Sequence, residues 1–385
     1  MAFVKRRSSF LTMVIAGVLL LAASSFAFLP RPTAHASDKR SDNFYVQTNL
    51  VSDLPNIAKV QDSHLVNSWG LAHGPKTPWW VADNGTGFAT TYNGGGQPLS
   101  TVVVIPPPKE SPAGTTATPT GIVFNSVNST NPDDFVVREN GKHGASVFMF
   151  ATEDGTISGW NPKVDATHAI LEVDRSKQQA VYKGLATGQN NGKDFIYATN
   201  FRFGLVEMFD AHFKLVKSFS DPQLFKDCGK GPCFAPFGIR NINGQIFVTF
   251  ALQNAARHDD VAGPGNGFVD VFNTDGKLIR RFASQGTLNS PWGLTLTPSN
   301  FGPFSNDLLI GNFGDGHINV FDPQTSKFLG QLPDQEGDPI AINGLWGLDF
   351  GNGGLAGETD ELFFAAGLND EANGLFGKIQ FVTDK

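Results

Sequence analysis

The sequence predicts an all-β protein, a six-bladed β-propeller with four-stranded antiparallel blades. Three observations predict it: a Gly-Leu or Gly-Ile step that recurs six times, a turn-rich composition, and a strand-like segment ahead of the first repeat. Of the 385 residues, 43 are Gly, 34 are Phe and 23 are Pro, and only 17% are charged. Such a composition is typical of turn-rich β-structure with a large core.

The recurring step marks the first, innermost strand of each blade. Its glycines are spaced 51 to 63 residues apart, close to the period of known propeller blades. They are Gly70, Gly121, Gly184, Gly238, Gly293 and Gly347. Six strands converge on one axis there, so we expect a residue without a side chain to permit close backbone approach. We expect the aromatic residue beside such a glycine to pack between neighbouring blades.

The blades fill a single domain over residues 37–385. Their expected ranges are 67–106, 119–175, 181–221, 235–283, 290–333 and 344–382. The last range lacks an outer strand, and we expect residues 44–51 to supply it and close the ring, which removes an exposed sheet edge. An insertion around residues 128–145 explains the long second repeat.

Residues 1–36 resemble a cleavable signal peptide. Lys5, Arg6 and Arg7 precede an uncharged apolar run over residues 10–28, and Ala34-His35-Ala36 offers a cleavage site. This pattern predicts a secreted or periplasmic protein with no membrane span after cleavage, and an uncleaved anchor is the alternative. Both the general secretory and the twin-arginine routes stay open.

The charge balance argues against nucleic acid as a partner. The chain carries a net charge of −7, and residues 1–36 contain four basic and no acidic residues, so the mature chain is more acidic still. An acidic surface repels phosphate backbones. We expect a monomer that binds a small polar ligand or a protein partner.

Two cysteines, Cys228 and Cys233, enclose a short loop. In an oxidising compartment, a disulfide between them is the favoured interpretation. A metal or redox pair is the alternative, but the chain around them lacks further Cys or His at ligand spacing.

Polar side chains should gather at one end of the channel. In a propeller, the approach to the first strand and the turn between the second and third strands share one face. The residues at those positions are Asp62, His64, Asn67, Asp83, Asn84, Glu153, Asp154, Asn200, Gln253, Asn254, Asn312, Asp315, Asn343, Asn369, Asp370 and Glu371.

Such a ring of oxygen-bearing groups suits Ca²⁺ or another divalent cation, or a small polar ligand. The alternative is that Asn and Asp merely shape tight turns. As ligand-binding candidates we select His64, Asn67, Asn84, Glu153, Asn254, Asn343, Asn369 and Asp370. The chain has neither a Gly-x-Ser-x-Gly elbow nor a His-Glu-x-x-His zinc motif, so catalytic residues and enzymatic activity stay undefined.

Several motifs resemble an uncharacterised family of exported bacterial proteins that are similar to NHL-type propellers. They are NLVSD (49–53), LVNSWGL (65–71), DNGTG (83–87), ATEDGTISGWNP (151–162) and NGLFG (373–377). The resemblance covers nearly the whole mature chain and implies the fold and export, but no activity.

A looser resemblance links the chain to gluconolactonase-type propellers, which bind a divalent metal at the channel mouth. It implies Asp83, Asn200 and Asn312 as metal ligands, although Asn67 stands where that family has a Glu. The leading hypothesis is therefore an exported propeller that binds a ligand or partner at its mouth. The alternatives are a divalent-metal-dependent hydrolase of lactones or sugar esters and a non-catalytic cell-surface scaffold.

Overall fold

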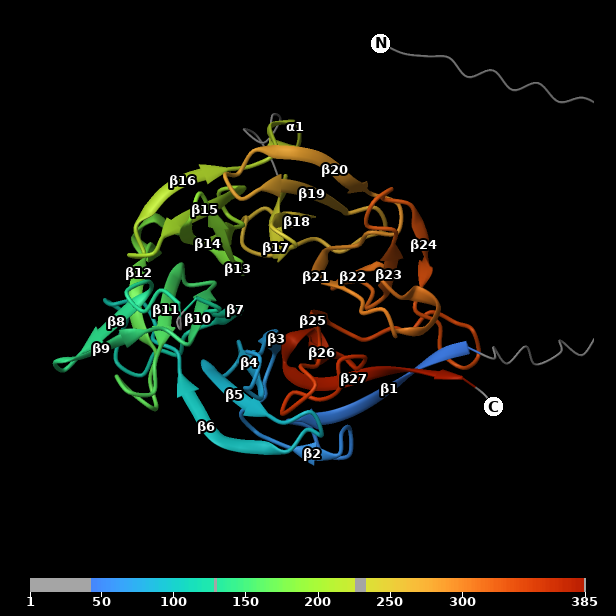
Figure 1. Ribbon diagram of the computed structural model, residues 1–385, viewed down its shortest axis with the longest axis horizontal. Helices are drawn as coiled ribbons and strands as arrows, with labels where there is room; N and C mark the ends of the chain where they lie inside the picture. Colours follow the sequence, from blue (N-terminus) through green and yellow to red (C-terminus); the bar gives the residue numbers. More distant parts are fainter. Residues whose placement is uncertain (1–42, 128–129, 226–232, 384–385) are drawn as a thin grey trace, which may run out of the picture. The chain divides into compact units, whose positions relative to one another are not determined.

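The computed structural model describes residues 43–127, 130–225 and 233–383. They belong to one compact unit, residues 39–385, and form six four-stranded blades around a central axis (Figure 1). The predicted fold class is confirmed. The expected signal peptide (1–36) and Cys228 lie outside the described residues. Among the described helices, none is long and apolar enough to cross a membrane.

The first three blades run in chain order from the axis outwards. Blade one contains β3 (Ser68–Ala72), β4 (Trp79–Asp83), β5 (Phe88–Tyr92) and β6 (Pro98–Val104). Blade two contains β7 (Pro119–Phe124), β10 (Phe148–Thr152), β11 (Thr156–Trp160) and β12 (Ile170–Asp174), and its expected insertion includes the hairpin β8 (Val136–Glu139) and β9 (Lys142–Ala145). Blade three contains β13 (Tyr182–Asn190), β14 (Lys193–Asn200), β15 (Leu205–Asp210) and β16 (Leu215–Phe219).

The next two blades repeat this order. Blade four contains β17 (Phe234–Ile242), β18 (Gln245–Leu252), β19 (Gly267–Asn273) and β20 (Leu278–Ser284). Blade five contains β21 (Pro291–Leu296), β22 (Leu308–Asn312), β23 (Ile318–Phe321) and β24 (Phe328–Gln331). Within the described ranges, the short α-helices are α1 (Pro222–Phe225) and α2 (Leu368–Glu371).

Blade six joins the two ends of the described chain. It contains β25 (Leu345–Phe350), β26 (Leu362–Gly367) and β27 (Asn373–Thr383), and its outer strand is β1 (Asn43–Ser52). β1 pairs antiparallel with β27, with Phe44 opposite Val382, and the two-residue β2 (Val60–Gln61) adds to it in parallel. The expected closure of the ring by the N-terminal strand is confirmed.

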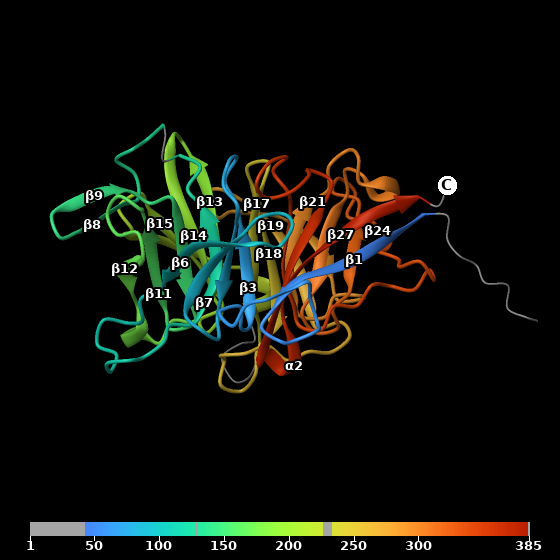
Figure 2. The same ribbon diagram turned by 90° about the horizontal axis from the view of Figure 1, so that it is seen from below.

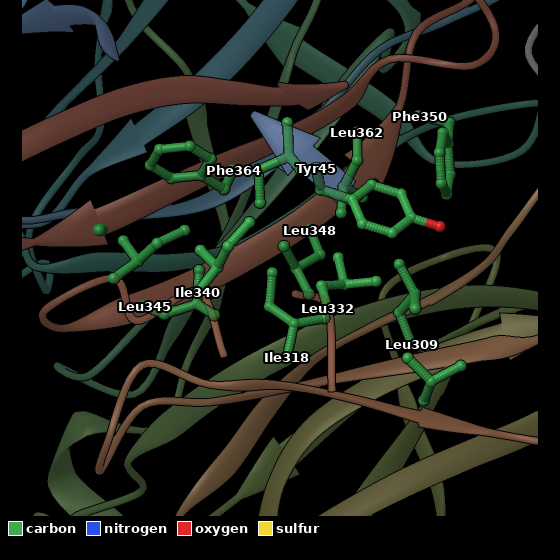
Figure 3. Close-up of a cluster of buried hydrophobic side chains, with 14 of the residues drawn as sticks. Tyr45, Leu309, Ile318, Leu332, Ile340, Leu345, Leu348, Phe350, Leu362 and Phe364 are labelled. Carbon is green, nitrogen blue, oxygen red and sulfur yellow. The ribbon is translucent and has the colours of Figure 1, made fainter. Parts of the chain in front are cut away.

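A buried apolar cluster binds this closing strand to blade five. Tyr45 of β1 belongs to this cluster together with Leu309 and Leu332 of blade five (Figure 3), and its ring centroid lies 4.8 Å from that of Phe301. Its hydroxyl also donates a 2.8 Å hydrogen bond to the carbonyl oxygen of Phe301. The closing strand is therefore held by its neighbouring blade as well as by β27.

The six recurring glycines lie where neighbouring innermost strands meet. A Cβ atom added to any of them would come within 2.9 Å of a backbone atom in the next blade, and within 2.0 Å at Gly238. At five of the six, that atom is the carbonyl oxygen of the residue just before the next blade's glycine, which for Gly347 is Trp69. The predicted reason for these glycines is confirmed.

The aromatic residues beside these glycines do pack between neighbouring blades, and they also meet across the ring. Trp69, Phe237 and Trp346 belong to one buried cluster, with Trp292 partly buried against it. Trp69 stacks on Trp346 with ring centroids 3.5 Å apart, and Phe237 reaches Trp346 across the ring at 5.6 Å. The strand pairing is irregular at this step, for example between Ser68 and Leu71 and between Leu345 and Leu348, so the aromatic side chain departs from the regular alternation of a strand.

Gly238→Ala should destabilise the propeller by about 3 kcal/mol, because the added methyl would overlap the carbonyl oxygen of Trp292 and force two blades apart. Urea unfolding measures this change. Gly354→Ala is the control, since its Cβ would lie 3.4 Å from the nearest atom, the Oδ1 of Asn352. Equal stability of the two variants would contradict the close-approach explanation.

Candidate functional site

A network of polar side chains spans one end of the channel. It is built from the residues just before the innermost strands, the turns between second and third strands, and α2, which Figure 2 shows at one face of the propeller. Asn67 lies before β3 and donates from Nδ2 to Asn84 Oδ1 and to Glu371 Oε1, both at 3.2 Å. Asn84 Nδ2 donates in turn to Glu153 Oε2 at 2.8 Å. The predicted residues Asn67, Asn84 and Glu153 therefore lie in one network.

Lys183 is the centre of this network. Its Nζ donates a hydrogen bond to Glu153 Oε1 and lies 3.5 Å from Asp259 Oδ1, yet only 2% of the side chain is exposed. It also lies 5.0 Å from the centroid of the Trp69 ring, within the range of a cation–π interaction. A ring of the aromatic cluster therefore packs against this buried ammonium group.

Burial and pairing act in opposite directions on this ammonium. Burial alone would lower the pKa of Lys183, but the negative charges of Glu153 and Asp259 outweigh it and raise that pKa above its ordinary value. Lys183 therefore remains positively charged. A buried charge is tolerated only when paired, and removal of one partner is strongly destabilising.

The surrounding carboxyl groups differ in their protonation. Burial, with the nearby charge of Glu153, raises the pKa of Glu371 to about 7, although Lys183 and Asn67 act in the opposite direction. The hydrogen bond with His258 and the charge of Lys183 hold the pKa of Asp259 at about 2, while burial raises the pKa of Asp260. The network therefore combines a permanent carboxylate with a carboxyl group that titrates near neutral pH.

The backbone that presents Glu371 is strained. Asn369, Asp370 and Glu371 are three consecutive residues with φ between 52° and 66°, a left-handed conformation that residues other than glycine rarely adopt. Asn343 Oδ1 accepts a hydrogen bond from the backbone N–H of Asn369, whose side chain donates to Asn373 Oδ1 at 3.0 Å. The predicted residues Asn343 and Asn369 thus hold the turn that positions Glu371, and Asp370 is exposed within it.

The loop between β18 and β19 brings Asp259 to the network. Asn254 Nδ2 donates to Asp259 Oδ2 at 3.2 Å, and His258 Nδ1 lies 2.7 Å from Asp259 Oδ1. Ligand atoms of Glu153, His258 and Asp259 all lie within 4.8 Å of one another, so this trio could hold a metal ion. The predicted residue Asn254 is therefore connected to the network by its hydrogen bond to Asp259.

The three residues implied as metal ligands lie in three different blades. Asp83 is fully buried in blade one and accepts a hydrogen bond from Thr90, and burial raises its pKa well above the ordinary value. Asn200 donates to Glu207 in blade three, and Asn312 donates to Asp315 and the carbonyl oxygen of Thr287 near blade five. The hydrogen bonds recorded for the described residues do not join these three side chains to one another.

His64 lies on the same face but outside the network. Its ring is partly exposed and its Nδ1 lies 2.8 Å from Asp62 Oδ1. Cys233 is buried. Its predicted disulfide to Cys228 stays a prediction, because that partner lies outside the described residues.

Sequence reasoning did not select Lys183, His258 or Asp259, and placed Glu371 in the ring without choosing it as a site residue. One signal could have identified Lys183. It precedes Gly184, and the corresponding residues before the other five glycines are Trp69, Thr120, Phe237, Trp292 and Trp346. A lysine at the channel axis is the exception in this series.

Comparison with known proteins supports the fold and leaves the function undefined. No family model matches the chain. Uncharacterized protein R648 of Acanthamoeba polyphaga mimivirus is 29% identical over 346 residues, which cover 86% of this chain and 78% of the viral protein. Uncharacterized protein R640 of the same virus is 35% identical over 232 residues, which cover 60% of this chain and 42% of that protein. These viral relatives do not support the bacterial and exported character of the resemblance.

Among solved structures, a catalytically inactive virginiamycin B lyase from Staphylococcus aureus with quinupristin aligns over 88% of this chain and all of its own, with a TM-score of 0.50 and 14% identity. A glucose dehydrogenase aligns over 86% of this chain and 98% of its own, with a TM-score of 0.49 and 12% identity. At such identities the similarity to the lyase shows the propeller fold alone.

Glu371→Gln should change how stability depends on pH. With a pKa near 7 in the folded state and 4.5 as the ordinary value, Glu371 keeps its proton in the folded protein while the unfolded chain releases it. The free energy of unfolding is therefore not reduced by Glu371 below about pH 4.5, where both states are protonated. It falls as the pH rises from about 4.5 to about 7, because the folded protein must then either hold a proton or bury a charge.

Glutamine cannot ionise, so the variant should gain roughly 1–2 kcal/mol relative to the wild type between pH 5 and pH 8. Urea unfolding at several pH values measures this gain, with the exposed Glu336→Gln as control. Parallel pH curves for Glu371→Gln and the wild type would contradict the assignment.

Proposed function

We propose that this protein is a ligand-binding propeller that recognises a small polar ligand at the network around Lys183. The observation that carries the proposal is the ammonium of Lys183, which is 2% exposed and held by Glu153 above the ring of Trp69. An apolar residue at position 183 could pack against the aromatic cluster without the free-energy cost of removing a charge from water. The presence of a lysine there therefore indicates a role beyond stability. Ionisable groups with perturbed pKa values at the end of a channel are typical of functional sites.

The charges of the network favour a ligand that donates hydrogen bonds or carries positive charge. Glu153, Glu371 and Asp259 supply three carboxyl groups against the one ammonium of Lys183. Asn67 and Asn84 add amide groups that already orient these carboxylates. A small amine or a polyol would satisfy such a set, whereas an anion would be repelled.

The site should respond to a panel of small amines and polyols in thermal shift experiments. We expect at least one compound to raise the melting temperature, because ligands that bind only the folded state stabilise it. Glu153→Gln should reduce the affinity for that compound at least tenfold, and Glu336→Gln, at an exposed position, should leave the affinity unchanged. A panel that stabilises neither the wild type nor the control, or that stabilises all three proteins alike, would contradict the proposal.

A divalent cation such as Ca²⁺ is the second candidate ligand. The grouping of Glu153, His258 and Asp259 favours a divalent cation, because their ligand atoms lie within 4.8 Å of one another; Ca²⁺ would use the carboxylate oxygens of Glu153 and Asp259. The ammonium of Lys183 already occupies Glu153 Oε1. A cation would therefore have to compete with Lys183.

Lys183→Met should strengthen Ca²⁺ binding at least tenfold, because it frees Glu153 and removes the competing positive charge. Melting temperatures measured across a Ca²⁺ titration and in EDTA report this change. Lys183→Arg keeps the charge and should bind Ca²⁺ as weakly as the wild type. Melting temperatures that respond neither to Ca²⁺ nor to EDTA in all three proteins would exclude the cation.

Export is part of the same proposal and is supported by the signal-like segment over residues 1–36. A ligand collected outside the cytoplasm would be consistent with a propeller without any recognised catalytic motif.

A further inference from the structure

A cavity of about 290 Å³ occupies the other part of the channel. Its walls are the innermost strands from their glycines onwards, such as Leu71–His73, Leu185–Thr187 and Ile239–Asn241. The network around Lys183 is built from residues that precede these strands or follow the second strands. The residues lining the cavity do not include Glu153, Lys183 or Glu371, so the two sites are separate.

One ion pair lines this cavity. Arg240 of β17 donates from Nη2 to Asp349 Oδ1 of β25 at 2.6 Å, and from Nη1 to the carbonyl oxygen of Leu348 at 3.4 Å. Blades four and six are not neighbours, and Thr295 of the intervening blade five also reaches Asp349 Oδ1 at 3.3 Å. The pair therefore spans three blades at the channel wall.

Both partners keep unused hydrogen-bonding capacity. A guanidinium has five N–H donors, and the contacts recorded for Arg240 use two of them. Asp349 Oδ1 accepts from Arg240, from Thr295 and from the backbone N–H of Phe350. Among the described residues, no hydrogen bond is recorded to Asp349 Oδ2. Both side chains are partly exposed, by 34% for Arg240 and 18% for Asp349.

The rest of the wall combines apolar side chains with strand edges. Leu71, Ile122, Leu185 and Leu294 line the cavity. Each innermost strand is also the edge of its sheet, and sheet edges present unpaired backbone N–H and C=O groups. The cavity therefore offers both apolar side chains and several convergent polar groups, and polar groups that fix a ligand's orientation are typical of small-molecule sites.

We propose that this cavity binds a free α-amino acid with an apolar side chain. The ligand's carboxylate would take the unused donors of Arg240, and its ammonium would donate to Asp349 Oδ2. A carboxylate and an ammonium on one carbon atom match a guanidinium and a carboxylate that lie side by side. The apolar residues of the wall then receive the side chain.

The charge balance of the cavity selects against ligands with a single charge. A simple anion that reaches Arg240 also approaches Asp349, and a simple cation that reaches Asp349 approaches Arg240. In each case a like-charge contact opposes binding. A zwitterion avoids both repulsions.

The test compares leucine with two derivatives that each lack one charge. N-acetylleucine lacks the ammonium and leucinamide lacks the carboxylate. Calorimetric titration of the wild type should show leucine binding at least tenfold more tightly than either derivative. Equal binding of all three compounds, or no binding of leucine at 20 mM (on the order of 2–3 kcal/mol of affinity), would overturn the proposal.

Two variants then test which side chain binds which charged group of the ligand. Arg240→Gln should reduce the affinity for leucine at least tenfold. Leucinamide should then bind more tightly than N-acetylleucine, because Asp349 still accepts the ammonium. Asp349→Asn should instead favour N-acetylleucine over leucinamide. Arg138→Gln removes an arginine from the exposed hairpin β8–β9 and should leave all three affinities unchanged.

A purely structural role for the ion pair cannot produce opposite preferences in the two variants, so an unchanged ranking in both would overturn the proposal. Should a variant fail to fold, the wild-type comparison of the three compounds decides alone. The outcome is independent of the network around Lys183.

Discussion

The close approach of the six innermost strands is the constraint on which the rest of the structure depends. At five of the six junctions, a carbonyl oxygen of one blade occupies the space that a Cβ of the previous blade would need. Because only glycine leaves that space free, the ring can close around a narrow axis. The pairing of β1 with β27 completes the same ring from the outside.

This constraint also decides what fills the channel. With the glycines turned to their neighbours, the aromatic residues before four of them meet across the ring: Trp69, Phe237 and Trp346 are buried in one cluster, and Trp292 packs against it. The cluster lies between the network around Lys183 and the cavity beside Arg240. Two chemically different environments therefore exist along one axis: an acidic network around a buried ammonium, and a cavity lined by one ion pair together with polar and apolar side chains.

Part of the candidate site was predictable, and the alternation of strand residues explains which part. Asn84, one residue beyond β4, reaches Glu153 at the mouth, whereas Asp83, the last residue of β4, is buried inside its blade. Asn200 and Asn312 also end second strands and are likewise fully buried. A turn position predicts the face of the propeller, but the direction of each side chain depends on the strand that precedes it.

The sequence by itself determined the number of blades, the place of the glycines and the closing strand, because each depends on a repeated local pattern. Only the tertiary structure decided which charges meet. Lys183 and Glu153 are 30 residues apart, Lys183 and Asp259 are 76 apart, and Arg240 and Asp349 are 109 apart. Nothing in a local pattern couples such residues. Their partners are set by the curvature of the ring, which brings different blades to the same point on the axis.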